Sequence, residues 1–314
     1  MKTSQKSVLP ASNKDITSEW LSGVLGANIQ IISLIAIGDD AGFMSDVFRI
    51  TLQSEEDSAE KHLPATLIIK IAAADEKRQA AATAYRSYQK EVQFYQNIAS
   101  QVGVRVPYCY FHACNVAGDR FALVLEDLGQ WKTVDRMSGA NFKQTMLAMT
   151  TLGKLHARYW GGTIRDIPGF TEGYQVAAEE LSIMIPAVLK DVATYANSVA
   201  FLLHYSQNIL SLLPRLQQQQ QTLNHMDFRL DNLRFTDDDT EIILFDWGEF
   251  AMAPPGYDLA HFLTTNIEIE NRRQWEEAAV ALYHQTLVRE GVLGISLAEI
   301  KDSYQQCIAP SFYV

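Results

Sequence analysis

The sequence has 314 residues, of which 47% are hydrophobic and 20% are charged, and its formal net charge is −11. At about 150 residues per domain, this length predicts two domains or one two-lobed unit. The excess of 37 acidic over 26 basic residues argues against a protein that binds the nucleic-acid backbone, because such a protein needs a basic surface. The same charge would be repelled by an anionic membrane surface. We therefore expect neither nucleic acid nor membrane among its partners.

Two further features of composition indicate the compartment. No apolar run is long enough to span a bilayer, and the first residues contain no apolar signal-peptide core. The three cysteines form no C-x-x-C pair, which argues against a disulfide framework and against a zinc site. These features predict a cytoplasmic protein.

The first third of the chain is typical of β-strands. In the second of them Phe48, Ile50 and Leu52 alternate onto one face, as a half-buried strand requires. Strands are expected at residues 29–37, 47–52, 65–72, 108–113 and 121–125. Residues 75–100 contain helix formers and neither proline nor glycine, so we expect one long helix there.

The remainder of the chain is mainly helical in pattern. Helices are expected at 141–160, as a pair within 175–215, and from Asp258 onward, with a strand hairpin at 233–235 and 242–245. A capping box at Ser296–Glu299 predicts the start of the last helix. The fold class is therefore α+β, with a mainly β N-terminal domain at 1–126 and a mainly α-helical C-terminal domain at 127–314.

The strongest motif is HMDFRLDN at 225–232, followed by the hairpin and then by Asp246-Trp247-Gly248. Asn232 immediately precedes the first strand of the hairpin and Asp246 follows the second. Antiparallel pairing is therefore expected to bring these two side chains together. Oxygen ligands without cysteine or further histidine suit Mg²⁺ rather than zinc. The alternative is a structural loop in which Asp227 forms an Asx-turn.

The pattern H-x-D-x-x-x-x-N followed by D-x-G matches the catalytic loop and the metal-binding motif of protein-kinase-like enzymes. Three more motifs occur in the required order: VLEDL at 124–128, LGKLHARYW at 152–160 and YDLAHFL at 257–263. From about residue 20 onward the sequence resembles the aminoglycoside phosphotransferase and choline kinase superfamily, and most of all its ecdysteroid-kinase-like branch. The resemblance implies a bilobal protein-kinase-like fold, with an antiparallel β N-lobe that carries one long helix and a mainly helical C-lobe. It also implies ATP and Mg²⁺ as cofactors.

The same resemblance assigns roles in the catalytic loop. Asp227 would orient the acceptor hydroxyl and take its proton, while Asn232 and Asp246 would hold Mg²⁺. Arg229 would stabilise charge on the transferring phosphoryl group. The alternative for Arg229 is a surface arginine or an ion pair that stabilises the fold.

A lysine and a glutamate upstream form the second expected cluster. Lys70 ends the apolar run LIIK, which resembles the kinase strand whose lysine contacts the nucleotide phosphates. Glu91 lies on the same helical face as Tyr88 and Tyr95, so its carboxylate is expected on the buried side and can pair with Lys70. Taken singly, the two residues are equally well explained as an edge-strand lysine and a surface glutamate.

Weaker signals complete the expected nucleotide site. The loop that contains Gly42 and Ser45 connects two strands and could fold over phosphates, although it departs from G-x-G-x-x-G and is equally well a glycine-containing turn. By resemblance, the backbone of Glu126, Asp127 and Leu128 would hold the adenine. Three residues are expected in structural roles: His156 in the core, His225 holding the loop through backbone hydrogen bonds, and Asp258 capping a helix and bracing the catalytic loop.

The acceptor is expected to be a small hydroxylated molecule. Only nine residues separate Gly248 from Asp258 and no A-P-E motif follows, which leaves no room for the segment on which protein kinases bind a peptide. The acceptor site is expected within 161–215 and in the helices after 258. Its candidate side chains are acidic residues or tyrosines: Asp166, Glu172, Glu179, Glu180, Glu268, Glu270, Tyr174, Tyr195 and Tyr205. A solvated acidic surface and core aromatics explain these residues equally well.

Two other functions compete with this one. The first is a nucleotide-binding pseudokinase, although such proteins usually lack the catalytic aspartate, the metal aspartate or the strand lysine. The second is a protein kinase of reduced architecture. The sequence leaves open the identity of the acceptor, the choice between ATP and GTP, and the oligomeric state.

Overall fold

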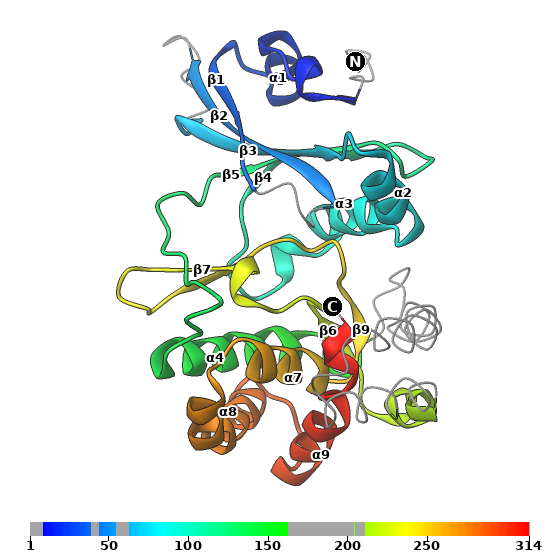
Figure 1. The fold of residues 1–314 in the computed structure, drawn as a ribbon, viewed down its shortest axis with the longest axis vertical. Coiled ribbons are helices and arrows are strands. Elements are labelled where there is room, and N and C mark those ends of the chain that lie inside the picture. The colour runs from blue at the N-terminus through cyan, green and yellow to red at the C-terminus, as the bar shows by residue number, and fades with distance from the viewer. Residues whose placement is uncertain (1–8, 39–43, 55–62, 163–203, 205–210, 314) are drawn as a thin grey trace, which may run out of the picture. The chain divides into compact units, whose positions relative to one another are not determined.

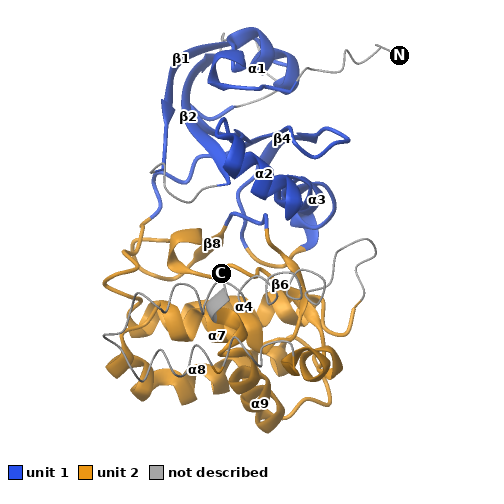
Figure 2. Cartoon of the chain, turned by 45° about the vertical axis from the view of Figure 1, so that its right-hand side comes forward, with its two compact units in different colours: residues 1–101, 105–131, 245–248 blue, residues 102–104, 132–244, 249–314 orange. Residues whose placement is uncertain are grey.

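The computed structural model describes residues 9–38, 44–54, 63–162, 204 and 211–313. The chain forms two compact units (Figure 2), and each is described by itself. Unit 1 comprises residues 1–101, 105–131 and 245–248, and unit 2 comprises residues 102–104, 132–244 and 249–314.

Unit 1 is built on a five-stranded antiparallel sheet with the order β1-β2-β3-β5-β4 (Figure 1). Its strands are β1 (Ile29–Ala36), β2 (Ser45–Ser54), β3 (Thr66–Ala72), β4 (Cys109–Cys114) and β5 (Phe121–Glu126). All five strands expected from the sequence are present, and their ends differ by at most two residues from the expectation.

One face of this sheet carries an apolar core that the sequence analysis did not foresee. Alternate residues such as Phe48 and Ile50 are buried against Leu21 and Leu25 of α1 (Ser18–Leu25). The helix starts at Thr17, whose side chain accepts a hydrogen bond from the backbone of Trp20, as an N-cap does. Helix α1 therefore seals this face of the sheet and leaves the other face for α3.

The single long helix expected at 75–100 is wrong. The structure has two helices, α2 (Glu76–Ala84) and α3 (Ser87–Asn97), because Arg86 adopts a left-handed conformation with φ of 59°. Sequence composition gave no sign of this break, since a left-handed residue is usually glycine or asparagine. The predicted buried face of α3 is nevertheless present, and it includes Tyr88 and Glu91.

Unit 2 is mainly helical. Its helices are α4 (Phe142–Arg158), α7 (Gly256–Thr265), α8 (Ile269–Arg289) and α9 (Leu297–Cys307), and its short strands are β6 (Thr222–Asn224), β7 (Leu233–Phe235), β8 (Ile242–Leu244) and β9 (Ala251–Ala253). Strands β6 and β9 pair with each other, and β7 and β8 form the expected hairpin. The capping box at Ser296 is present at the start of α9.

Short 3₁₀ helices lie at Asn13–Asp15, Ala99–Gln101, Leu230–Asn232 and Pro310–Tyr313. Residues 211–218 are helical, so this helix ends within the run of five glutamines at 217–221. The other helices expected between 175 and 210 lie outside the described residues. In the part of the chain that the structure covers, no helix is both long enough and apolar enough to cross a membrane.

Candidate functional site

The expected ion pair of Lys70 and Glu91 is present in unit 1 and includes a third member. The Nζ atom of Lys70 lies 2.8 Å from Oε1 of Glu91 and 2.9 Å from Oδ1 of Asp246. The side chains of Lys70 and Glu91 are 10% and 4% exposed, whereas that of Asp246 is 34% exposed. One buried ammonium group is thus shared by two carboxylates, one of which reaches solvent.

The electrostatics of this cluster follow from its charge count. Burial alone would lower the pKa of Lys70, but the charges of Asp246 and Glu91 raise it above its ordinary value, so Lys70 stays protonated. Burial raises the pKa of Glu91, and Asp246 adds to this, while Lys70 opposes it. Asp246 is the most exposed of the three side chains, so it is the carboxylate of the cluster that a further cation could reach.

Segment 245–248 is fixed to unit 1 by its tryptophan. Trp247 is fully buried and stacks on Phe94 of α3, with ring centroids 4.0 Å apart. Asp246 itself has φ of 66°, a left-handed conformation that is unfavourable for most residues and that turns its side chain toward Lys70. The stacked ring therefore holds the strained residue in place.

Strand register adds residues that the motif search missed. Lys70 pairs with Val47 on β2 and with Leu123 on β5, so these three side chains share one face of the sheet. The next row on that face contains Ile68. Val47 and Ile68 are half-buried, so part of their apolar surface is exposed. Alternation with Lys70 along the strands was the signal that could have identified them.

The side chains of the expected adenine-binding segment are engaged in ion pairs. The carboxylate of Glu126 accepts two hydrogen bonds from Arg105, at 2.6 and 2.7 Å, and a third from the backbone of Tyr108 at 2.9 Å. The carboxylate of Asp127 binds Arg49 at 2.8 and 3.1 Å. The carbonyl of Leu128 accepts a bond from the amide of Trp131. Ser45 is buried at the start of β2, and Gly42 lies outside the described residues.

In unit 2 the structure brings three of the predicted catalytic-loop residues together. The Nδ2 atom of Asn232 donates to Oδ2 of Asp227 at 2.7 Å and to the carbonyl of Asp227 at 3.0 Å. The Nε atom of Arg229 lies 3.0 Å from Oδ1 of Asp227. The amide of Asn232 thus donates to one carboxylate oxygen, and the positive charge of Arg229 lies beside the other.

A histidine that the sequence analysis did not single out also faces this carboxylate. The Nε2 atom of His261, on α7, lies 4.0 Å from Oδ1 of Asp227. Burial lowers the pKa of His261 to about 4, so this ring is neutral at pH 7. Its place in YDLAHFL, on the buried face of α7, was the only signal in the sequence.

The backbone of the catalytic loop is braced by one buried carboxylate. Asp258 accepts the amide of His225 at 2.6 Å and that of Met226 at 2.9 Å, and its side chain is fully buried. The brace is therefore confirmed, but the predicted cap is wrong, because Pro255 is the N-cap of α7 and Asp258 lies within its first turn. Met226 has φ of 72°, a conformation that these two bonds hold.

His156 is a core residue, as expected. It is fully buried, and its Nδ1 atom lies 2.7 Å from the hydroxyl of Tyr283 on α8. Its Nε2 atom is 3.6 Å from Oδ2 of Asp258, so this core contact reaches the residue that braces the loop.

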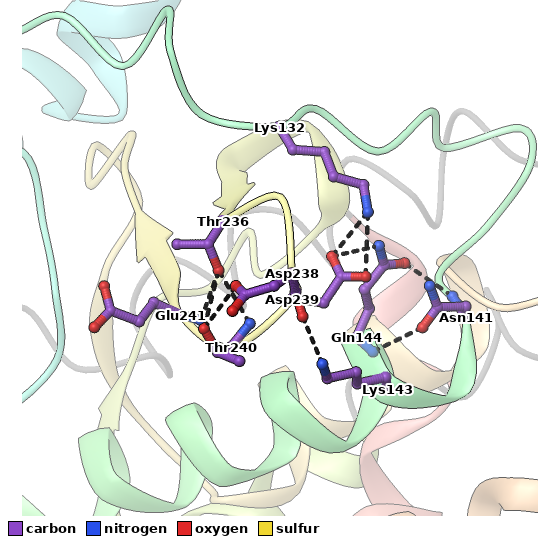
Figure 3. Close-up of polar contacts among 9 residues, drawn as sticks. All are labelled: Lys132, Asn141, Lys143, Gln144, Thr236, Asp238, Asp239, Thr240 and Glu241. Atoms are coloured by element: carbon purple, nitrogen blue, oxygen red, sulfur yellow. Dashed lines mark hydrogen bonds and ion pairs between the residues drawn. The ribbon is translucent and has the colours of Figure 1, made fainter.

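The hairpin that follows Asn232 is anchored to α4 (Figure 3). Asp239, in the turn between β7 and β8, accepts bonds from Lys132 and Gln144, each at 3.0 Å from its Oδ1 atom. Lys143 donates to the neighbouring carbonyl of Asp238. The turn is thus held both by Lys132, which lies before α4, and by two residues of α4. These bonds fix the hairpin whose first strand begins just after Asn232.

The expected convergence of Asn232 and Asp246 remains a prediction. Asn232 belongs to unit 2 and Asp246 to unit 1. Along the chain, Asn232 comes one residue before Leu233, Asp246 comes two residues after Leu244, and these two strand residues are paired.

The candidate acceptor residues lie largely outside the described part of the chain. This holds for Asp166, Glu172, Glu179, Glu180, Tyr174, Tyr195 and Tyr205. Glu268 and Glu270 are exposed at the start of α8, and Glu270 pairs with Arg273 at 2.8 Å.

Comparison with solved structures identifies the fold. A complex of APH(2")-IIia with GDP and kanamycin is 14% identical, covers 90% of this chain and 91% of its own, and has a TM-score of 0.54. Ethanolamine kinase of Plasmodium vivax is 14% identical, with coverages of 91% and 73% and a TM-score of 0.51. Choline kinase of Cryptosporidium parvum Iowa II is 12% identical, with coverages of 90% and 81% and a TM-score of 0.52. These likenesses confirm the expected kinase-like fold.

Comparison of sequences identifies the family. No curated protein matched the chain. The model of the ecdysteroid kinase-like family matches residues 39–158 and 167–292, a span that contains both charged clusters. The chain therefore belongs to the ecdysteroid kinase-like family.

Proposed function

We propose that the protein is an ATP- and Mg²⁺-dependent phosphotransferase that phosphorylates a hydroxyl group of a small molecule. The observation that carries this proposal is the buried Lys70 ammonium shared by Glu91 and the partly exposed Asp246. Burying a lysine in this way is unfavourable unless other groups compensate its charge. A nucleoside triphosphate is a ligand that needs both a fixed cation for its phosphates and a carboxylate for its metal ion.

In this proposal the residues of unit 1 bind the nucleotide. Lys70 donates to phosphate oxygens, and Glu91 fixes the position of its ammonium group. The apolar faces of Val47 and Ile68 contact the base, and the backbone of Glu126 to Leu128 provides its hydrogen bonds. The Gly42–Ser45 loop would contribute backbone amides to the phosphates.

The residues of unit 2 act on the acceptor. Asp227 accepts a hydrogen bond from the acceptor hydroxyl and takes its proton as the hydroxyl oxygen bonds to the γ-phosphorus. The bond from that phosphorus to the β,γ-bridging oxygen breaks, and ADP leaves with that oxygen. Asn232 orients the carboxylate through its hydrogen bond, and Arg229 places a positive charge beside it. Arg229 can then release Asp227 and compensate charge on the transferring group.

The donor set fits Mg²⁺. The predicted ligands Asp246 and Asn232 would supply a carboxylate and an amide oxygen, which are the hard ligands that this ion takes together with phosphate oxygens. Asp246 is the partly exposed carboxylate of the Lys70 cluster, so a divalent cation would bind there. When bound, the ion would withdraw charge from the phosphate oxygens.

A small-molecule acceptor is supported by the short connection from Gly248 to α7 and by the fold. Proteins of this fold include kinases for choline and ethanolamine and an enzyme crystallised with kanamycin.

The cysteines Cys109, Cys114 and Cys307 are all free thiols, which supports a cytoplasmic setting.

The test is a phosphorylation screen with Mg²⁺-ATP and Mg²⁺-GTP over hydroxylated metabolites, sterols and aminoglycosides, detected by the mass shift of the product. Wild-type protein should phosphorylate one class, and the Asp227→Asn variant should not. Binding without transfer to any acceptor would favour a pseudokinase, and phosphate incorporated into protein would favour a protein kinase. Calorimetry adds a metal test, because ATP should bind more tightly with Mg²⁺ and Asp246→Ala should remove that gain.

A further inference from the structure

Arg49 of β2 forms a two-point ion pair with the segment from Glu126 to Gly129, at the end of β5, which we call the connector. Its Nε atom lies 2.8 Å from Oδ2 of Asp127, and its Nη2 atom lies 3.1 Å from Oδ1. The side chain of Asp127 is 7% exposed, whereas that of Arg49 is 40% exposed. Parallel bonds of this kind fix orientation as well as distance, which a single lysine bond does not.

Gly129 completes this contact. Its amide donates to Oδ1 of Asp127 at 2.9 Å. A Cβ atom at Gly129 would lie 2.9 Å from Nη2 of Arg49, closer than real contacts allow. The guanidinium therefore lies directly on the glycine, and we call Arg49, Asp127 and Gly129 the connector clamp.

The connector clamp lies on the same face of the sheet as Lys70. Arg49 pairs with Ile68 on β3, and Ile68 pairs with Leu125 on β5, two residues before Asp127. The adjacent row contains Val47 and Lys70. The clamp therefore joins the connector to the sheet beside the half-buried Ile68. Lys70 lies in the next row of the same face.

The clamp also determines which groups remain for a base. The carboxylate of Asp127 is occupied by Arg49 and Gly129, and that of Glu126 is occupied by Arg105 and Tyr108. Backbone donors and acceptors of the connector are then the groups that can contact a planar heterocycle, and their positions depend on the clamp.

We propose that Arg49 is a positioning residue for the nucleobase end of the nucleotide site, acting through Asp127 and Gly129 on the connector backbone. The inference rests on the proposed function, because it takes the nucleotide to bind along this face. Without the clamp the connector must be ordered when the nucleotide binds, which lowers affinity for ligands that carry a base. Ligands that consist of phosphates alone do not contact the connector and keep their affinity.

The test compares ATP with inorganic tripolyphosphate, each with Mg²⁺, by calorimetry on the full chain. Arg49→Ala should weaken ATP binding about 3- to 10-fold, the loss expected for ordering the connector upon binding. It should leave tripolyphosphate binding unchanged. Lys70→Ala should weaken the binding of both ligands, because they share the phosphates that Lys70 is proposed to bind.

Two variants separate positioning from charge and from general instability. Gly129→Ala keeps Arg49 but displaces its guanidinium, so it should reproduce the selective loss for ATP. Arg49→Lys keeps the charge without the two-point geometry and should not restore wild-type affinity. Arg120→Ala, which removes an exposed bond to the carbonyl of Ala11 in the same unit, is the matched control and should bind both ligands as the wild type does.

The outcomes distinguish this inference from the proposed function. Equal loss of ATP and tripolyphosphate in Arg49→Ala, or unchanged ATP affinity in both Arg49→Ala and Gly129→Ala, would overturn the inference while wild-type binding still supports the function. If the wild type binds neither ligand, the proposed function and the inference both fail.

Discussion

The two charged clusters are built in opposite ways. In unit 1, Lys70, Glu91 and Asp246 come from three distant segments and are held by direct ion pairs. In unit 2, Asp227 and Asn232 are five residues apart on one loop, and the loop backbone is held by Asp258. The first cluster therefore depends on the packing of a whole unit, and the second depends on local geometry fixed from behind.

Because of this difference, substitutions in the two clusters should change different properties of the protein. A buried glutamate that loses its lysine becomes an uncompensated charge in the core of unit 1. A catalytic carboxylate that becomes an amide keeps its shape and its neighbours. Changes in the first cluster should affect folding and nucleotide binding, whereas changes at Asp227 should affect the chemical step.

The largest effect is expected at Asp227. Asp227→Asn should lower turnover by a factor of about 10² to 10⁴, because it removes the proton acceptor. The dissociation constant for Mg²⁺-ATP should remain nearly unchanged. Steady-state kinetics and calorimetry on one preparation measure both quantities, with Asp231→Asn as a control on the same loop. Wild-type turnover in Asp227→Asn would show that Asp227 is a structural loop residue.

The next largest effect is expected in the Lys70 cluster. Lys70→Ala should lower the free energy of unfolding by about 3 to 5 kcal/mol, because it leaves the buried Glu91 without its partner. Glu91→Ala should lower it by less, because Lys70 keeps its ion pair with Asp246. The double variant should lose clearly less than the sum. Urea unfolding measures all three, and Arg273→Ala, which removes an exposed ion pair, should leave stability unchanged. Strictly additive losses would mean that the two residues act independently.

A smaller effect is expected from the pH dependence of His261. Its pKa is about 4 in the folded protein against 6.5 as the reference, so between these values the unfolded chain binds more protons than the folded one. Stability should therefore fall as the pH falls from 6.5 to 4, by up to about 3 kcal/mol at 1.36 kcal/mol per pKa unit. The free energy of unfolding of the wild type minus that of His261→Gln, measured across this range, isolates the contribution. A constant difference would contradict the buried neutral ring.

The smallest effect is expected at the hairpin turn behind the catalytic loop. Asp239→Asn should lower the free energy of unfolding by about 1 kcal/mol, because it weakens the bonds from Lys132 and Gln144. Asp239→Ala should lose more, since φ of 52° is more favourable for asparagine than for alanine. Asp238→Asn is the neighbouring control and should match the wild type in thermal unfolding. An unchanged Asp239→Ala would show that the turn is held by its backbone alone.

Strands and motifs could be predicted from the sequence because their signals are local. Alternation along β2 and β3, the LIIK run that ends at Lys70 and the loop around Asp227 each lie within a few residues of chain. The ion pair of Lys70 with Glu91 was also accessible, because helical periodicity places Glu91 on a buried face. These signals depend on the backbone period and not on tertiary contacts.

Other features depend on contacts between distant segments and could not be predicted. The break at Arg86 and the left-handed Asp246 contradict local conformational preference and are stabilised by their surroundings, such as the stack of Trp247 on Phe94. Asp258 was expected to be the N-cap of its helix because aspartate is a common N-cap residue, but Pro255 occupies that position. The connector clamp joins residues 78 positions apart, and only the register of β2 against β3 and β5 reveals it.

The brace by Asp258 also governs how the catalytic loop exchanges its amide hydrogens with solvent. The amides of His225 and Met226 find their acceptors on α7, 33 and 32 residues further along the chain. These hydrogens can exchange only when α7 separates from the loop, so the loop should have the same opening free energy as the helix. An irregular segment thereby gains the protection of a core element, and during folding it can reach its final conformation only after α7 has docked.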